Sequence, residues 1–376
     1  MEKYTLIATT TFGLEAICKR ELIDLGMEIK KVQDGRIYFE GTMEDVAKAN
    51  LWLRTADRLL IELGNFKALT FEELFDQVYD LPWDQIIPAN GNFIINGKSI
   101  KSKLFSISDC QRITEKAIIK KLQTKYNISW FEKSGALYDI EVALLKDNAS
   151  ITLDTTGKGL HKRGYRIKHG DAPIKETLAA AMVLLSFWNK DRLLYDPFCG
   201  SGTILVEAAM IGRNIAPGLD RGFAFNNWTG VDKEILKAAK RAAQEQIDNK
   251  SALNLIGTDI DLEMVSLAKE IVENLGFEDD IKIIHKDFRN LDLEDDYGVM
   301  ITNPPYGQRL STVNVQSLEQ DLGQKFKNLK TWSKYIITSN EDFEKNFGKK
   351  ADKKRKLYNG RLKVDYYQYY GPRPDF

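Results

Sequence analysis

The sequence predicts an α/β protein with a Rossmann-like domain in its carboxyl-terminal half and a smaller α+β region before it. Beyond residue 190, short apolar segments alternate with helical ones, which is the pattern of a parallel, doubly wound sheet. A glycine-rich turn, Gly200-Ser201-Gly202, follows the first of these apolar segments. In the first 154 residues, short strands and helices alternate and end in a tightly connected strand pair, which indicates small α+β units.

Two units are expected in the amino-terminal region. Strand patterns at 5–10, 36–40 and 58–63 and helical patterns at 14–25 and 45–55 match a ferredoxin-like unit, whose order is strand-helix-strand-strand-helix-strand. The second unit has expected helices at 71–78 and 108–126, with Ser108 as the N-cap of the longer one, and expected strands at 92–98, 138–145 and 150–154. These patterns divide the region into domains at 1–65 and 66–156.

The carboxyl-terminal domain is expected to span 174–376, after a basic linker at 157–173. An apolar helix opens this domain at 174–188. Expected strands follow at 193–195, 253–258, 281–286, 298–302 and 335–339, with helices between them. We expect the charged run at 349–356 to be a mobile loop and 364–370 to be the final strand.

The formal net charge is zero, since 54 lysines and arginines balance 54 acidic residues. A nucleic-acid-binding protein of this composition must concentrate its positive charge in patches. Such patches occur at 98–103, at 161–169, where Tyr165 stands between arginines, and at 349–356. The nucleic-acid contacts that we expect are Lys98, Lys101, Lys103, Lys162, Arg163 and Arg166.

Several classes of protein are excluded by what the sequence lacks. Three cysteines and three histidines are too few for a disulfide framework or a typical zinc site, so we expect no metal. The chain has no apolar run of about 18 residues and does not begin like a secretory signal. We therefore expect a cytoplasmic protein with reduced thiols and no membrane contact.

A candidate ligand loop lies between an expected strand and the helix that begins near Ile204. Its sequence is Asp196-Pro197-Phe198-Cys199-Gly200-Ser201-Gly202-Thr203. Glycines at such a turn let the backbone approach a bound nucleotide closely. The loop is not a phosphate-binding P-loop, because no Gly-Lys-Ser/Thr follows, and it lacks the third glycine of the dinucleotide fingerprint.

The next strand ends in Gly257-Thr258-Asp259, and a carboxylate at this place can accept hydrogen bonds from both hydroxyls of a ribose. Asp259 lies well beyond the usual offset of about 20 residues after the glycines. An insertion at 212–251 accounts for the excess. Asp220 and Asp232 are alternatives, but Asp220 follows no strand and Asp232 is more typical of a helix cap. Ile260 offers an apolar face for a purine.

The third strand ends in Lys286-Asp287-Phe288. Asp287 could bind an adenine amino group and Phe288 could pack on the ring. Taken alone, an aspartate at a strand end is more often a helix cap. Its position in series with the two preceding loops favours the ligand contact.

The fourth segment, Asn303-Pro304-Pro305-Tyr306, follows the expected strand 298–302. The two prolines fix the backbone and remove two amide donors. The Asn303 side-chain oxygen and the Pro304 carbonyl can then accept hydrogen bonds from an amino group and direct its lone pair toward an electrophilic methyl group. Tyr306 can stack on an extruded base.

Together these segments resemble the class I methyltransferases that methylate amino groups. The flanking segments Leu160-His-Lys-Arg-Gly-Tyr-Arg-Ile and Ala172-Pro-Ile-Lys-Glu-Thr-Leu-Ala-Ala narrow the resemblance. The whole chain is similar to bacterial proteins that join a THUMP RNA-binding domain to a methyltransferase domain, relatives of the guanine-N2-methyltransferases of 23S ribosomal RNA. This resemblance implies a ferredoxin-like and THUMP region before the methyltransferase domain, with S-adenosyl-L-methionine as cofactor and S-adenosyl-L-homocysteine as product.

The resemblance also implies a role for each matching residue. The methionine part of the cofactor would contact Lys175, Glu176, Asp196, Phe198, Gly200, Gly202 and Thr203. Asp259 would hold the ribose, and the adenine would lie against Ile260, Asp287 and Phe288. Asn303 would border both the cofactor and the target base, which Pro304, Pro305 and Tyr306 also hold.

The implied substrate is a guanine N2 amino group in RNA, most simply 23S rRNA or a large-subunit precursor. Transfer RNA remains the nearest alternative substrate. Adenine-N6 DNA methyltransferases and protein-glutamine methyltransferases use the same Asn-Pro-Pro-Tyr segment, and a non-catalytic ribosome-assembly factor is a further alternative. We expect direct in-line methyl transfer, with Cys199 as a packing residue only. The sequence does not predict the oligomeric state.

Overall fold

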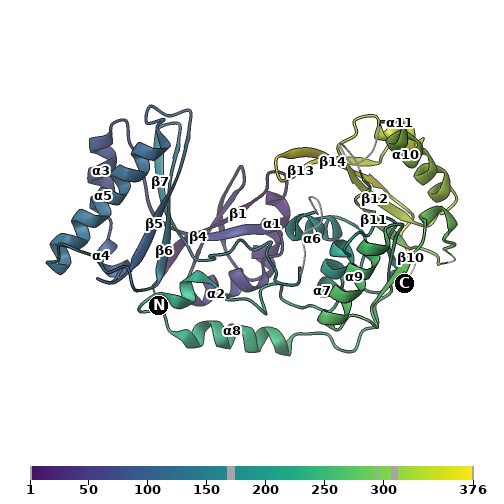
Figure 1. The fold of residues 1–376 in the computed structure, drawn as a ribbon, viewed down its shortest axis with the longest axis horizontal. Coiled ribbons are helices and arrows are strands. Elements are labelled where there is room, and N and C mark those ends of the chain that lie inside the picture. The colour runs from purple at the N-terminus through teal and green to yellow at the C-terminus, as the bar shows by residue number, and fades with distance from the viewer. Residues whose placement is uncertain (1, 167–173, 294, 306–311, 375–376) are drawn as a thin grey trace. The chain divides into compact units, whose positions relative to one another are not determined.

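The computed structural model describes residues 2–166, 174–293, 295–305 and 312–374. The chain forms two compact units (Figure 1). The amino-terminal unit consists of 1–10, 19–160 and 221–242, and the carboxyl-terminal unit consists of 11–18, 161–220 and 243–376. Among the described helices, none is both long and apolar enough to cross a bilayer.

The amino-terminal unit is built on one seven-stranded sheet with the order β2-β3-β1-β4-β7-β6-β5. Its strands are β1 (Tyr4–Thr10), β2 (Ile29–Gln33), β3 (Arg36–Gly41), β4 (Ala56–Lys67), β5 (Asn92–Ile100), β6 (Leu137–Leu145) and β7 (Asn148–Asp154). Its helices in this part of the chain are α1 (Glu15–Asp24), α2 (Met43–Trp52), α3 (Phe71–Tyr79), α4 (Trp83–Ile86) and α5 (Ile107–Tyr126). The order β1-α1-β2-β3-α2-β4 confirms the ferredoxin-like unit. β2 is the strand of this unit for which the sequence patterns indicate no range.

Strand β4 joins the ferredoxin-like part to the part that follows it. Its first half pairs with β1, and from Leu60 onward it pairs with β7 on its other side. The domain boundary that we expected after residue 65 therefore falls inside a 12-residue strand that both parts share. The expected N-cap Ser108 is wrong, because α5 already begins at Ile107 and Ser106 is its N-cap.

The carboxyl-terminal unit has a second seven-stranded sheet with the order β10-β9-β8-β11-β12-β14-β13. Its strands are β8 (Leu194–Asp196), β9 (Leu255–Asp259), β10 (Ile281–His285), β11 (Val299–Thr302), β12 (Ser333–Thr338), β13 (Lys353–Asn359) and β14 (Leu362–Tyr369). The first five strands in this order are parallel, and β14 and β13 are antiparallel additions. This arrangement confirms the expected doubly wound sheet.

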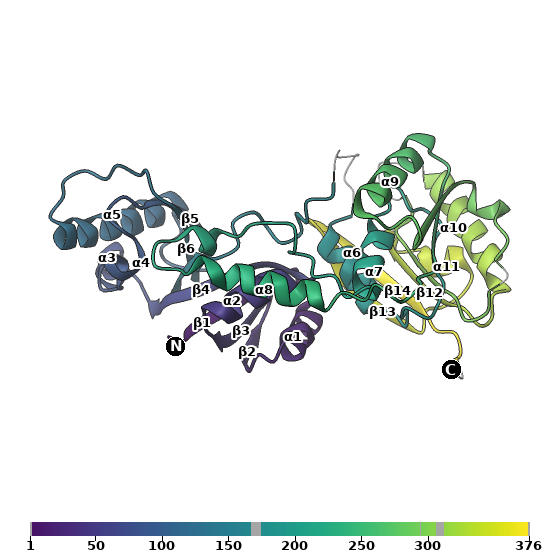
Figure 2. The same cartoon turned by 90° about the horizontal axis from the view of Figure 1, so that it is seen from below.

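Helices cover both faces of this sheet (Figure 2). They are α6 (Glu176–Leu184), α7 (Thr203–Gly212), α9 (Leu262–Leu275), α10 (Thr312–Lys327) and α11 (Phe343–Phe347), with a short 3-10 helix, η2 (Phe288–Asn290). Because side chains alternate along a strand, Val299 and Ile301 pack with α6, α7 and α9, whereas Met300 packs with α10 and α11. Strand β11 thus contributes to two cores, which fixes its register and the place where it ends.

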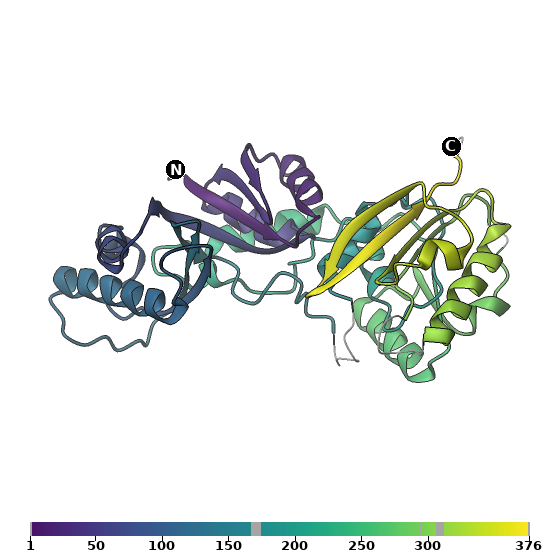
Figure 3. The ribbon, with the colours of Figure 1, turned by 90° about the horizontal axis from the view of Figure 1, so that it is seen from above.

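The charged run at 349–356 is not the loop that we expected. Residues Lys353–Asn359 form β13, which pairs with β14 in a long hairpin, drawn in yellow in Figure 3. β13 is the edge strand of its sheet, where charged side chains can face solvent and discourage pairing with other chains. The charge of the run therefore reflects its edge position.

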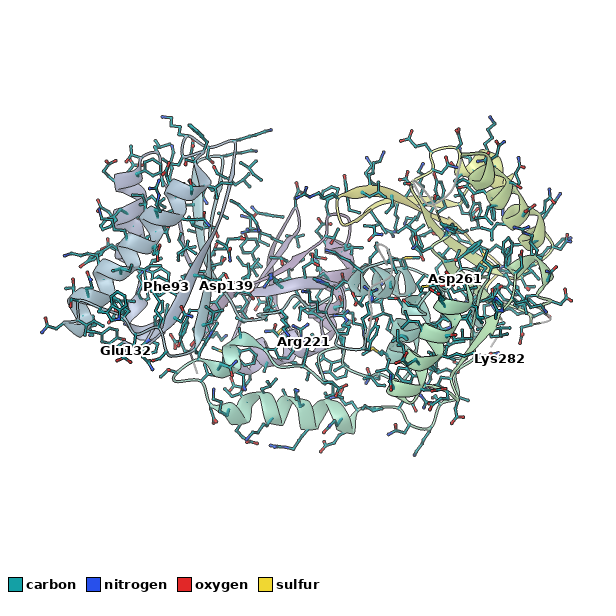
Figure 4. The ribbon with its side chains drawn as sticks, in the orientation of Figure 1. Phe93, Glu132, Asp139, Arg221, Asp261 and Lys282 are labelled. Atoms are coloured by element: carbon teal, nitrogen blue, oxygen red, sulfur yellow. The ribbon has the colours of Figure 1, made fainter. Side chains whose placement is uncertain are left out.

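Part of the insertion at 212–251 belongs to the amino-terminal unit. This part, 221–242, includes the 3-10 helix η1 (Ala224–Asn227) and most of helix α8 (Lys233–Glu245). The Trp228 ring stacks on Tyr138 with centroids 5.5 Å apart, and its Nε1 donates to the Leu137 carbonyl at 3.1 Å. Arg221, labelled in Figure 4, donates to the Gly159 carbonyl at 2.9 Å. The continuous domain that we expected over 174–376 is thus interrupted by a segment that folds with the other unit.

Candidate active site

The candidate site lies at the carboxyl edge of the parallel strands. β8 pairs with β9 on one side and with β11 on the other, so it stands where the strand order reverses. Ligands of open α/β sheets bind at this switch point, beyond the carboxyl ends of the strands. The loops after β8, β9, β10 and β11 carry the four segments that the sequence singled out.

Asp196, the last residue of β8, connects two of these loops. Its carboxylate is 1% exposed and accepts hydrogen bonds from Thr302 Oγ1 at 2.6 Å and from the Phe198 amide at 3.1 Å. Burial raises the pKa of Asp196 to about 7, and the hydrogen bonds from Thr302 and Phe198 oppose that rise. Asp196 therefore fixes the start of the glycine-rich loop against the strand that leads to Asn303.

The glycines of the loop have conformations that other residues rarely adopt. Gly200 and Gly202 have φ of 51° and 79°, and a Cβ at Gly200 would meet nothing within 4 Å. At Gly257 the constraint is space, because a Cβ there would lie 2.5 Å from Leu205 Cδ1 and 2.9 Å from Cys199 Cβ. The buried Cys199 has a thiol pKa raised well above its usual value by desolvation, which keeps it protonated and unreactive.

Asp259 ends β9 beside the same loop. Its Oδ2 accepts the Gly200 amide at 2.9 Å, and its Oδ1 accepts the Asp261 amide at 3.0 Å. The following Ile260 is 71% exposed, which leaves an apolar surface next to a carboxylate. Its rival Asp232 accepts the Glu234 amide just before α8 and belongs to the amino-terminal unit, so it serves as a helix cap. The ribose and adenine roles of Asp259 and Ile260 remain predictions.

Aromatic side chains bring the loops after β8 and β10 together. The rings of Phe198 and Phe288 are tilted at 60° with centroids 5.1 Å apart. Asp287 caps η2 by accepting the Arg289 amide at 2.9 Å, and it also forms an ion pair with the Arg289 guanidinium at 3.5 Å. The helix-cap role considered for Asp287 is thus present, and its contact with adenine remains a prediction.

Asn303 follows β11 directly. Its side-chain oxygen Oδ1 is buried and has no hydrogen-bond partner among the residues that the structure describes. Pro304 is buried and Pro305 is half-buried, while Tyr306 lies outside the described residues. A buried amide oxygen without a partner is costly, and an incoming amino group would satisfy it.

The linker arginines occupy a different environment from the one that we expected. Arg163 Nε lies 3.4 Å from Glu207 Oε1, with side chains only 2% and 0% exposed, and Tyr165 donates to the same oxygen at 3.0 Å. Arg166 forms an ion pair with Glu176 at 3.3 Å and donates to Thr203 Oγ1 at 3.2 Å.

The expected RNA contact of Arg163 is therefore corrected, because its guanidinium group is held inside the carboxyl-terminal unit. The half-buried Arg166 is engaged by Glu176, and its contact with RNA remains a prediction. The sequence did contain a signal for this pairing. Glu176 and Glu207 lie in otherwise apolar helices, where a buried carboxylate needs a cation. Lys162 is exposed, and its contact with RNA remains a prediction.

The opening of α6 lies near the same loop. Lys175 is the N-cap of this helix, and Glu176 is its first residue. Burial raises the pKa of Glu176, against the effect of Arg166, and its Oε2 has no partner within the described part of the chain. An unpartnered carboxylate oxygen, an open glycine loop and a second carboxylate beside an apolar surface fit a ligand that carries an amino group, a ribose and an aromatic base.

The predicted lysines of the amino-terminal unit differ from one another. Lys98 lies on β5, and its ammonium is 2.6 Å from Glu141 Oε2. Lys101 and Lys103 follow this strand on the surface, and within the described residues neither takes part in an ion pair. Only the latter two offer charge that the protein does not already neutralise.

Comparisons with known proteins agree with this architecture. A family model described as the RMKL-like methyltransferase domain matches 163–368, a model of the RlmL ferredoxin-like domain matches 5–60, and the THUMP domain model matches 68–154. The carboxyl-terminal unit therefore has the class I methyltransferase fold.

Two curated relatives and one solved structure illustrate the similarity. The protein named "Putative RNA methyltransferase YpsC" of Bacillus subtilis (strain 168) is 48% identical over 373 residues, which cover 98% of this chain and 97% of that protein. Ribosomal RNA large subunit methyltransferase K/L of Buchnera aphidicola subsp. Acyrthosiphon pisum (strain APS) is 36% identical over 82% of this chain, which spans only 46% of that relative's length. The solved structure described as "Crystal structure of SMU.472, a putative methyltransferase complexed with SAH" superimposes with a TM-score of 0.94 at 46% identity, and the match covers 100% of both chains.

Proposed function

The chain belongs to the RMKL-like methyltransferase family, and we propose that it transfers a methyl group from S-adenosylmethionine to the N2 amino group of a guanine in RNA. The proposed RNA is 23S rRNA or a large-subunit precursor. S-adenosylmethionine is the family's cofactor, and it supplies an electrophilic methyl group bound to sulfur. The remaining work falls to side chains of this protein, which must hold the acceptor amino group and exclude water.

The observation that carries the proposal is the buried Oδ1 of Asn303, which has no hydrogen-bond partner in the described ranges of the chain. This atom can accept a hydrogen bond from an amino group of the base and so orient the nitrogen lone pair. Asp196 and Thr302 brace the position, since their hydrogen bond ties β8 to the strand that leads into Asn303. Transfer of this kind requires positioning and no protein nucleophile, which agrees with a buried and protonated Cys199.

Cofactor recognition is proposed for the loops around the switch point. Asp259 would accept the ribose hydroxyls, and Ile260 and Phe288 would contact the adenine. Glu176 offers a buried carboxylate oxygen for the amino group at the methionine end. Gly200 and Gly202 leave the backbone open to close approach.

RNA as the substrate is supported by the amino-terminal unit. Residues 68–154 match the THUMP domain, and YpsC carries an RNA methyltransferase name. The relatives named K/L support ribosomal RNA. Asn303 does not distinguish the two bases, because it would accept the amino group of adenine equally well. Guanine is therefore supported only by the resemblance to guanine-N2-methyltransferases.

The proposal is tested with the full chain, labelled cofactor and RNA. Unmodified transcripts of 23S rRNA and 16S rRNA and a pool of unmodified tRNA are incubated in parallel, then digested to nucleosides and separated. We expect label in N2-methylguanosine from 23S rRNA, and none with the Asn303→Ala variant. Label in N6-methyladenosine would overturn the choice of base, label in tRNA alone would overturn the choice of RNA, and unlabelled RNA of all three kinds would overturn RNA methylation itself.

A further inference from the structure

A pocket of about 750 Å³ lies in the carboxyl-terminal unit, away from the loops described above. The end of α10, the start of β12, the end of α11 and the end of β14 surround it, and Figure 1 shows α10 and α11 side by side in this region. Lys334 is the second residue of β12, whereas Asn303 follows the opposite, carboxyl end of the neighbouring β11. The pocket therefore opens at the amino edge of the parallel strands.

The walls of this pocket are closely packed. A Cβ at Gly323 of α10 would lie 2.1 Å from the Phe347 carbonyl oxygen, so the two helices touch through backbone at this point. The rings of Phe347 and Tyr369 have centroids 4.7 Å apart, and the Tyr369 hydroxyl donates to the Lys349 carbonyl at 3.0 Å. The shape of the pocket is thus set by fixed aromatic and backbone contacts.

The lining is positively charged and contains no acidic side chain. The lining includes four lysines, Lys327, Lys330, Lys334 and Lys349, and we call this cavity the lysine pocket. In the ranges that the structure describes, none of them forms an ion pair with a carboxylate. Carboxylates on adjoining elements are engaged elsewhere, since Glu319 accepts from the Asn346 side chain and Asp352 accepts from the Tyr370 amide.

One of the four lysines is partly desolvated. The Lys334 ammonium donates to the Leu329 carbonyl at 2.6 Å, and burial followed by repulsion from Lys349 lowers the pKa of Lys334 to about 8. A lysine with this environment gains from a bound anion, which would stabilise its charged form. Lys349 lies over the face of the Tyr369 ring, with its ammonium 5.8 Å from the ring centroid, so this lysine is also held at the pocket by the protein.

A second pocket at the same edge shows that this charge is not a general property of the edge. It has a volume of about 540 Å³ and lies at the starts of β9 and β10. There Lys269 and Lys282 are accompanied by Glu273, Glu278, Asp279 and Asp280. Figure 4 labels both edges of these strands, with Lys282 near the amino end of β10 and Asp261 just after the carboxyl end of β9.

We propose that the lysine pocket binds phosphate groups of the RNA substrate. It would hold the RNA backbone at the edge of the sheet opposite the loops proposed for the cofactor. RNA as the ligand rests on the proposed function. Ammonium groups bind phosphates as point charges and add affinity and register without reading sequence. A pocket of about 750 Å³ is large enough to hold a phosphate with part of its nucleotide. A folded ribosomal RNA is large enough to reach this edge while a base occupies the site near Asn303.

The test compares two variants of the full chain. Lys327, Lys330 and Lys349 are replaced together by glutamine, while Lys334 is kept because its ammonium bonds the Leu329 carbonyl. The matched control is the double variant Lys269→Gln/Lys282→Gln in the acidic pocket. Binding of a 23S rRNA transcript is measured at several KCl concentrations, and thermal unfolding verifies that both variants fold.

We expect the triple variant to bind at least tenfold more weakly in 0.1 M KCl. Its slope of log affinity against log salt should fall by about 2, since each phosphate contact contributes roughly 0.7–0.9. The control should match the unmodified protein. Acetylation of the unmodified protein gives a second readout, in which bound RNA protects Lys330 and Lys349 but not Lys282.

Three outcomes would overturn the proposal or separate it from the proposed function. Unchanged affinity and slope in the triple variant would overturn the pocket's role while leaving methylation intact. If the unmodified protein neither binds nor methylates RNA, the proposed function fails, and calorimetry with inorganic tripolyphosphate examines the pocket itself. Tripolyphosphate binding that the triple variant loses would then assign the pocket to free polyphosphates and overturn RNA as its ligand, and absence of binding would overturn the phosphate site.

Discussion

The two edges of the methyltransferase sheet carry their cations in opposite ways. At the carboxyl edge, the buried Arg163 pairs with Glu207 and the half-buried Arg166 pairs with Glu176, beside the loop that follows β8. At the amino edge, the lysine pocket has no carboxylate in its lining. The first arrangement is internally neutralised and holds structure together, and the second leaves positive charge for a ligand.

This difference shows that the density of positive charge along a sequence does not locate an RNA surface. The linker at 161–166 looked the most suggestive segment, because it combines arginines with an aromatic residue. Its arginines form ion pairs with glutamates that lie 10 and 44 residues further along the chain, in apolar helices. The lysines of the pocket are scattered over 327–349 and form a cluster only in the fold.

The largest expected effect concerns the buried ion pair of the carboxyl edge. Glu207→Ala leaves the Arg163 guanidinium buried without its carboxylate, and we expect a loss of about 3–5 kcal/mol in the free energy of unfolding. Urea denaturation measures this loss. The double variant Arg163→Met/Glu207→Leu should recover most of it, because an apolar pair carries no uncompensated charge.

Urea denaturation of a Lys330 variant gives the matching measurement at the amino edge. Lys330→Ala should change the free energy of unfolding by no more than about 0.5 kcal/mol, because its exposed ammonium has no protein partner among the described residues. A loss of similar size at Glu207 and at Lys330 would remove the distinction between a structural cation and a ligand-binding one.

The next effect concerns Asn303, whose uncharged side-chain oxygen lies at the same carboxyl edge as the two arginine–glutamate pairs. We expect Asn303→Ala to slow methyl transfer by about 100- to 1,000-fold, as loss of a single positioning hydrogen bond does in other enzymes. Cofactor affinity should change little, so single-turnover rates and equilibrium binding are measured together. The control is Asn249→Ala at an exposed position of the same unit. Equal losses in both variants, or a normal rate in Asn303→Ala, would remove Asn303 from the reaction.

Much of the fold and of the candidate site could be predicted from the sequence because both depend on local patterns. Apolar strands followed by Asp196, Asp259 and Asn303 place these residues at one sheet edge, since parallel strands end together. The ion pair of Arg163 with Glu207 and the packing of Trp228 on Tyr138 could not be predicted in this way. They join residues 44 and 90 positions apart, and no periodicity encodes such contacts.

A smaller effect is expected in the pH dependence of stability. Burial raises the pKa of Asp196 in the folded protein to about 7, against about 4 in an unfolded chain. Between these values the folded state holds a proton that the unfolded state has released, so raising the pH through this window destabilises the protein. The cofactor-free protein should therefore lose roughly 1 kcal/mol per pH unit from this group.

Asp196→Asn tests this assignment, because asparagine stays neutral and can still accept the hydrogen bond from Thr302. The difference in unfolding free energy between variant and unmodified protein should grow in favour of the variant as the pH rises from 4 to 7. Denaturation series at four pH values measure it. Parallel stability curves would show that Asp196 does not titrate in this range.

The smallest effect extends the comparison of paired and unpaired cations to the amino-terminal unit. Lys98 is already neutralised by Glu141, which also pairs with Arg36 at 3.3 Å, whereas Lys101 and Lys103 have no such partner among the described residues. We expect Lys101→Gln/Lys103→Gln to weaken binding of a 23S rRNA transcript about three- to tenfold and to lower its salt slope by about 1.5. Lys98→Gln should have less than a twofold effect, because RNA must compete with Glu141 for that ammonium. If Lys98→Gln weakened binding by as much as half the effect of the double variant on a logarithmic scale, an exposed ion pair would not remove a lysine from RNA recognition. Ion pairing would then distinguish structural from ligand-binding cations only where both partners are buried.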